Sequence, residues 1–132
     1  MRETVYPLTG KSAVDCGFLT YESVDNGTSD IDTCAKSAVE SGKPFRFGYQ
    51  GNDDELIYCT VAVRADDGQL WSLNFYVPVS EAMKKIDAQF RLQALRCSSI
   101  RIQSGRGFFA FDGCTDATDD LVASLHRKKP SG

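Results

Sequence analysis

Five cysteines and a single histidine are the residues of this 132-residue chain best suited to chemistry. The cysteines are Cys16, Cys34, Cys59, Cys97 and Cys114. None of their spacings is Cys-x-x-Cys, which argues against a zinc ribbon or a thioredoxin-type site. A nucleophilic cysteine or serine needs a nearby base, and His126 is expected to be a solvated residue at the basic end of a helix. We therefore assign no catalytic residue, metal ligand or cofactor, and the sequence does not favour an enzyme.

Four of the cysteines can be paired from the elements that carry them. If Gly105-Arg106 is the turn of a hairpin, Cys97 and Cys114 lie opposite each other at its open end. Cys16 and Cys34 would join a first strand to the helix beside it, and the fifth cysteine would remain a small core hydrophobe. Two disulfides and one buried thiol fit an oxidising compartment, and the alternative is a wholly reduced protein.

Carboxylates form three groups along the chain. They are Asp53-Asp54-Glu55, Asp66-Asp67, and Asp116 with Asp119 and Asp120. Paired carboxylates are able to transfer protons or to bind a cation. Each group, however, lies in a predicted turn or helix start, where aspartate caps the backbone. Asn26-Gly27-Thr28 is a glycosylation sequon only in a eukaryotic secreted protein, and we interpret it as a turn.

The composition excludes some partners. With 15 basic and 18 acidic residues the formal net charge is −3, which argues against general nucleic-acid binding because that requires a basic field. No apolar run approaches the roughly 20 residues that cross a bilayer. The start, residues 1–7, lacks the apolar stretch of an export signal. The disulfide prediction favours a mature secreted or periplasmic protein, with a cytoplasmic protein as the alternative.

Residues 1–13 form a polar arm, and the sequence leaves open whether this arm is structurally ordered. The elements that position the cysteines and carboxylates follow it. Residues 16–21 are rich in strand formers and predict a first strand. A helix follows, beginning at an aspartate cap and ending at Gly42, with Cys34 on its small apolar face.

Strict alternation of apolar and polar side chains predicts three strands in the middle of the chain. They cover residues 45–50, 57–64 and 71–77. A three-residue turn at Asp66-Asp67-Gly68 pairs Val63 with Trp71 and keeps the large apolar residues of both strands on one face. Its glycine suits the left-handed third position of such a turn. The same register places Tyr58 opposite Tyr76 on the other face.

The last third of the chain predicts three more elements. Ser80 caps a second helix with Met83 on its apolar face. The C-terminal end of this helix is undefined, because residues 92–95 fit either a helix or a strand. A second hairpin over residues 100–111 has isoleucines opposite phenylalanines, and a third helix begins at residue 115 or 116.

The resulting order is β-α-β-β-β-α-β-β-α. Helices interrupt a largely antiparallel sheet, so the predicted fold class is α+β. We expect a single domain over residues 14–127, followed by a basic tail at residues 128–132.

One face of the predicted sheet carries the candidate binding residues. They are Arg46, Gln50, Tyr58, Arg64, Asn74 and Tyr76, with Thr60 among them. Tyrosine and arginine are favoured at interfaces because each buries a large area. A cross-strand tyrosine pair is also ordinary sheet stabilisation, and helices could instead cover this face.

The chain resembles two groups of known proteins. In its αβββαββα element order, its size and its acidity it is similar to the class I type III secretion chaperones, small dimers that hold partner proteins. Its extra first strand and its cysteines depart from that family. Asp15-Cys16-Gly17, followed by Cys34 before a small helix, is similar to small exported bacterial domains of unknown function.

Three hypotheses for function result. The first is an exported, non-enzymatic binding or interaction module whose partner is unknown, with a protein partner, self-association and a small molecule all left open. The second is an intracellular chaperone-like or regulatory protein that self-associates as a dimer. The third is a small-ligand-binding or enzymatic domain with a pocket between the sheet and the helices.

Overall fold

The computed structural model describes residues 2–19, 29–52, 54–84, 91–103 and 108–128. In chain order the elements are α1 (Arg2–Thr9), β1 (Val14–Leu19), α3 (Ser29–Ser41), β2 (Phe45–Asn52), β3 (Leu56–Arg64), β4 (Leu70–Pro78), α4 (Val79–Lys84), β5 (Arg91–Cys97), β6 (Ser99–Gln103), β7 (Phe108–Asp112), β8 (Thr115–Asp116) and α5 (Thr118–Lys128).

The strands form a large and a small sheet. The large sheet has six strands in the order β1-β2-β3-β4-β5-β8, and the small one consists of β6 and β7. Of the strand pairs in the described ranges, β1–β2 is parallel and the others are antiparallel. The fold is therefore α+β with a largely antiparallel sheet in a single domain, as the sequence predicts.

The register of β3 and β4 agrees with the sequence prediction. Val63 pairs with Trp71, and Tyr58 pairs with Tyr76. Between the strands, the Ala65 N–H donates to the Gln69 carbonyl oxygen at 2.9 Å, which closes the expected three-residue turn. Gly68 has a φ of 90°, a conformation that glycine adopts without a steric penalty.

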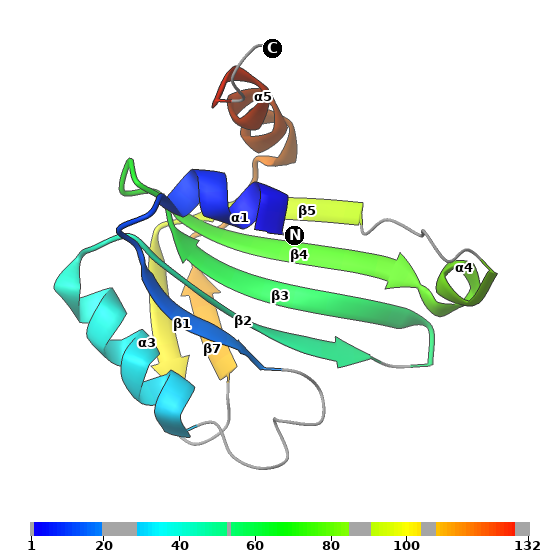
Figure 1. The fold of residues 1–132 in the computed structure, drawn as a ribbon, viewed down its shortest axis with the longest axis horizontal. Helices are drawn as coiled ribbons and strands as arrows, with labels where there is room; N and C mark the ends of the chain where they lie inside the picture. The colour runs from blue at the N-terminus through cyan, green and yellow to red at the C-terminus, as the bar shows by residue number, and fades with distance from the viewer. Residues whose placement is uncertain (1, 20–28, 53, 85–90, 104–107, 129–132) are drawn as a thin grey trace.

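Each face of the large sheet carries its own apolar cluster. Figure 1 shows the arrangement of the helices around this sheet. Helices α1 and α5 close the cluster on one face. Its buried members include Val5, Leu8, Val61, Val63, Trp71, Leu73 and Leu121. Helix α3 and the β6–β7 hairpin close the cluster on the opposite face. Its buried members are Ala35, Ala38, Phe45, Phe47, Ala62, Leu70 and Ile100.

The arm expected at residues 1–13 contains a packed helix. Val5 and Leu8 are buried in the core, at the i, i+3 spacing of one helix face. The Asp66 N–H donates to the Leu8 carbonyl oxygen at 2.9 Å, which joins the end of α1 to the β3–β4 turn. Pro7 lies inside α1, and it obscured this helix in the sequence because proline usually ends one.

The ambiguous segment after the second helix is a strand. β5 pairs with β4, placing Ala94 opposite Leu73 and Leu92 opposite Phe75. A strand here gives the backbone groups on the second edge of β4 hydrogen-bond partners, which a helix would not provide. The preceding helix α4 is short, and Met83 is 83% exposed, so the predicted apolar face of that helix is not packed at this residue.

Candidate functional site

The structure corrects the predicted binding face. β2 pairs with β3 so that Phe45 lies opposite Arg64 and Arg46 lies opposite Val63. Side chains of cross-strand partners point to the same face, so the phenylalanines of β2 lie on the face opposite to Val63. The prediction had placed all apolar side chains of the three strands on one face, whereas the sheet has an apolar cluster on each.

The six predicted residues are thereby divided between the two faces. Arg46 and Gln50 lie on the face of α1 and α5, whereas Tyr58, Arg64, Asn74 and Tyr76 lie on the face of α3. The tyrosines and Asn74 remain together, and both arginines hold helices in place.

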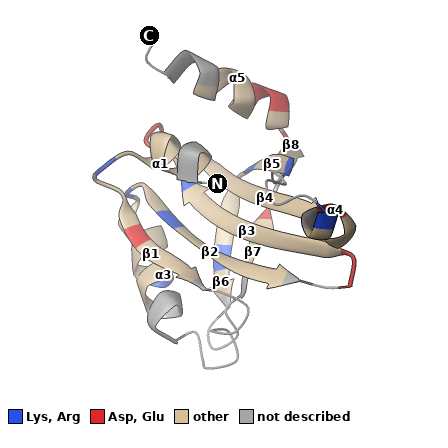
Figure 2. Ribbon diagram, turned by 45° about the vertical axis from the view of Figure 1, so that its right-hand side comes forward, with Lys and Arg blue, Asp and Glu red and all other residues tan. Residues whose placement is uncertain are grey.

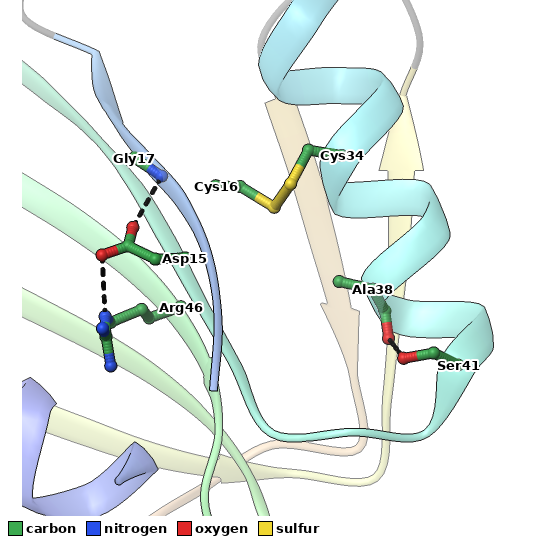
Figure 3. Close-up of a disulfide and its surroundings, with 7 residues drawn as sticks. All are labelled: Asp15, Cys16, Gly17, Cys34, Ala38, Ser41 and Arg46. Atoms are coloured by element: carbon green, nitrogen blue, oxygen red, sulfur yellow. Dashed lines mark hydrogen bonds and ion pairs between the residues drawn. A yellow bond between two sulfur atoms is a disulfide. The ribbon is translucent and has the colours of Figure 1, made fainter. Parts of the chain in front are cut away.

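Arg46 anchors α1 to the sheet. Its Nε donates to Asp15 Oδ2 at 3.0 Å, and its Nη1 donates to the Thr9 hydroxyl at 2.7 Å (Figure 3 shows the Asp15 contact). The guanidinium also lies 4.3 Å from the centre of the Tyr6 ring. With its side chain 12% exposed, Arg46 is not available to a partner.

Arg64 has the same kind of role on the opposite face. Its Nη1 donates to the Val39 carbonyl oxygen in α3 at 3.3 Å, and its guanidinium lies 5.2 Å from the centre of the Phe45 ring. Arg64 therefore helps to hold α3 against the sheet.

Beyond the part covered by α3 and the hairpin, the same sheet face becomes polar. Cross-strand pairing places Tyr58 beside Tyr76 and Thr60 beside Asn74, and β5 extends these rows with Arg91 and Gln93. We call these six residues the polar face: Tyr58, Thr60, Asn74, Tyr76, Arg91 and Gln93. All of them are half-buried or exposed. The sequence prediction missed Arg91 and Gln93 because it did not recognise β5 as a strand.

Local contacts order the side chains of the polar face. The Thr60 hydroxyl donates to Asn74 Oδ1 at 3.1 Å, and Arg91 forms an ion pair with Glu81 of α4 at 2.8 Å. The ring of Tyr58 occupies the space above Gly51, since a Cβ there would lie 2.7 Å from the ring Cζ. Tyr58 is nevertheless 39% exposed, so part of its ring meets solvent.

Two disulfides secure the elements around the sheet. Cys16 in β1 is bonded to Cys34 in α3, with their Cα atoms 5.7 Å apart (Figure 3). Cys97 is bonded to Cys114 at the base of the β6–β7 hairpin, with a Cα separation of 4.0 Å. These are the pairs expected from the sequence. Cys59 is a buried free thiol, and burial raises its pKa, which is unfavourable for a nucleophile.

A cleft of about 310 Å³ lies on the opposite side of the sheet from the polar face. It is formed where α1, α5 and the β3–β4 turn meet the ends of β4 and β5. Its walls include Leu8, Asp67, Trp71, Arg96, Asp120 and Leu121. Figure 2 shows the acidic first turn of α5, the helix that contributes Asp120 to the cleft. This is a pocket between sheet and helices of the kind that the third hypothesis requires.

Within the described ranges, no group of three or more histidine, cysteine or acidic residues could hold a metal ion. None of the helices in those ranges has the length and apolar character needed to span a membrane. The side chain of His126 and the Asn26-Gly27-Thr28 sequon lie outside what the structure describes.

Comparison with known proteins gives no match. No protein-family model, curated protein or solved structure is significantly similar to this chain. The polar face and the cleft, and the residues that form them, are therefore the basis of the functional proposals.

Proposed function

We propose that the protein is a non-enzymatic binding module, exported in its native setting, and that the polar face is its contact surface. The observation that carries the proposal is the change from apolar to polar side chains along one face of the large sheet. The covered part is apolar, whereas the adjoining part presents tyrosine hydroxyls, amides and a hydroxyl at half-buried or exposed positions.

The chemistry of the polar face favours recognition through hydrogen bonds and aromatic contact. Arg91 is the one charged member of the face, and Glu81 already neutralises it. Tyrosine supplies a large contact area with few rotatable bonds, which is why it is enriched at interfaces. Such a surface suits a protein partner and gives no basic field for nucleic acid.

The two disulfides support the export part of the proposal. Disulfides form and persist in oxidising compartments and are rare in the cytosol. Both bonds join elements that pack around the large sheet, so their retention would stabilise the scaffold that presents the polar face.

Site-specific photo-cross-linking in the native cells tests the contact surface. A photoreactive amino acid at exposed Gln93 should give an adduct, and the double substitution Tyr58→Ala and Tyr76→Ala should remove it. The same probe at Ser37, exposed on α3, is the matched control and should give no adduct above background. An adduct with the mass of two chains would identify a second copy as the partner, as in the dimer hypothesis.

An adduct that forms equally at positions 93 and 37, or that survives the double substitution, would overturn the proposal. Thermal unfolding of the double variant provides the control for folding. Because both tyrosines are at least partly exposed, we expect the fold to be retained.

A further inference from the structure

The cleft beside Trp71 combines a guanidinium, two carboxylates and an apolar wall. Its volume of about 310 Å³ is at the lower end of the range for small-molecule sites. It lies on the face opposite to the polar face, so a ligand bound there would not touch the proposed contact surface.

Arg96 supplies the guanidinium, which lies over the Trp71 ring while its side chain remains 44% exposed. The guanidinium lies 5.0 Å from the centre of the Trp71 ring, and Trp71 is only 4% exposed. An aromatic surface that is itself buried restricts where the guanidinium can lie.

The hydrogen-bond donors of Arg96 are not saturated by the described part of the chain. There, its acidic partner is Asp120, with Nη2 and Oδ2 separated by 3.8 Å. This is an ion pair, but it is longer than the roughly 2.7–2.9 Å of a charge-assisted hydrogen bond. The Asp120 side chain is 73% exposed, so the ion pair is screened by water and an incoming carboxylate can displace it at little cost.

The other residues that line the cleft determine which charges a ligand can carry. Asp67 and Asp120 contribute two carboxylates to the walls, against the single guanidinium of Arg96. Asp67 Oδ1 accepts the Gln69 N–H at 3.0 Å, so its Oδ2 is the oxygen considered for a ligand. A simple anion would be repelled by the two carboxylates, and a simple cation would pair with them but leave the guanidinium of Arg96 without a new partner. A molecule that carries both charges a few ångströms apart satisfies both sets of groups. Leu8 and Leu121 add an apolar wall for an aliphatic group.

We propose that this cleft binds a small zwitterion, namely a free α-amino acid with an apolar side chain. The ligand carboxylate accepts hydrogen bonds from Arg96, and the ammonium lies against Asp67 and Asp120. The apolar side chain packs against the wall formed by Leu8 and Leu121.

The chain itself provides the means of detection, because Trp71 is its only tryptophan. Titration of the wild-type protein with L-leucine should change the tryptophan fluorescence saturably, with a Kd below about 10 mM. Two analogues that each lack one charge, isoamylamine and 4-methylpentanoate, should bind at least about tenfold more weakly. Absence of saturation by L-leucine at about 10 mM would overturn the proposal, as would equal binding of the three compounds.

Two variants, measured by calorimetry, distinguish charge recognition from a general loss of structure. Arg96→Gln should weaken L-leucine about tenfold and strengthen isoamylamine, because the repelling cation is gone. Asp120→Asn should weaken L-leucine and strengthen 4-methylpentanoate for the converse reason. Arg101→Gln, which removes an exposed guanidinium from β6, is the matched control and should leave all three affinities unchanged. If both cleft variants weaken every compound alike, the proposed pairing of charges is wrong.

Discussion

The guanidinium of Arg46 donates a hydrogen bond from Nε to Oδ2 of Asp15, with the two atoms 3.0 Å apart. The pair joins β2 to β1, and a second hydrogen bond from the same guanidinium reaches the Thr9 hydroxyl in α1. One nearly buried side chain therefore connects the sheet edge to a helix that also contributes Leu8 to the cleft.

Replacing Arg46 should loosen α1. We expect Arg46→Met to lower the free energy of unfolding by about 1–3 kcal/mol, because hydrogen bonds to a charged group in a shielded position are lost. Arg101→Met is the control, since its ion pair with Asp112 is largely exposed and should contribute at most about 1 kcal/mol. Chemical denaturation measures both. Equal losses in the two variants would show that Arg46 does not anchor the helix.

Two glycines of β2 should respond differently to the same substitution. A Cβ at Gly48 would lie 2.7 Å from the Thr60 carbonyl oxygen, which is backbone and cannot easily move. A Cβ at Gly51 would meet the outer atoms of the Tyr58 ring, which can rotate away. We expect Gly48→Ala to cost about 1–3 kcal/mol in denaturant unfolding and Gly51→Ala clearly less. The reverse order would contradict the described packing of β2.

Thiol counting tests the disulfides and, with them, the main support for export. Protein purified in air, unfolded and not reduced, should show one free thiol, because four of its five cysteines are bonded. In the folded protein that thiol, Cys59, should react slowly because burial shields it and raises its pKa. Five free thiols after unfolding would reject both bonds.

The start of α5 predicts a pH-dependent contribution to stability. Asp116 Oδ1 accepts hydrogen bonds from the Thr118 N–H at 3.0 Å and the Thr118 hydroxyl at 2.8 Å, and these bonds lower the pKa of Asp116 from 3.8. A carboxyl group with a lower pKa in the folded state stabilises the fold above its unfolded pKa. This stabilisation is lost as the pH falls through the folded value.

Wild-type protein should therefore lose more unfolding free energy than Asp116→Asn between about pH 5 and pH 2. Every other carboxyl group is present in both proteins, so the difference between the two curves isolates Asp116. Denaturant unfolding at a series of pH values provides the curves. Parallel curves would mean that the Thr118 hydrogen bonds do not depend on the ionised carboxylate.

The sequence alone determines those features of this protein that depend on elements adjacent in the chain. Alternation and a glycine turn are sufficient to pair Val63 with Trp71 and Tyr58 with Tyr76, because a slip of one residue would expose the apolar set. The same reasoning across the second hairpin brings Cys97 opposite Cys114. For this reason the fold class, both disulfide pairs and four of the six residues of the polar face were predictable.

Tertiary structure decides which face each strand buries and which distant elements meet. The phenylalanines of β2 alternate as clearly as the apolar residues of β3, but the pattern does not show that α3 and the small sheet cover them from the opposite side. Residues 92–95 form a strand because β4 has a second edge with backbone groups to satisfy. Arg96 approaches Trp71 and Asp120 only after three separate elements have packed, so the cleft depends on long-range contacts that no local pattern specifies.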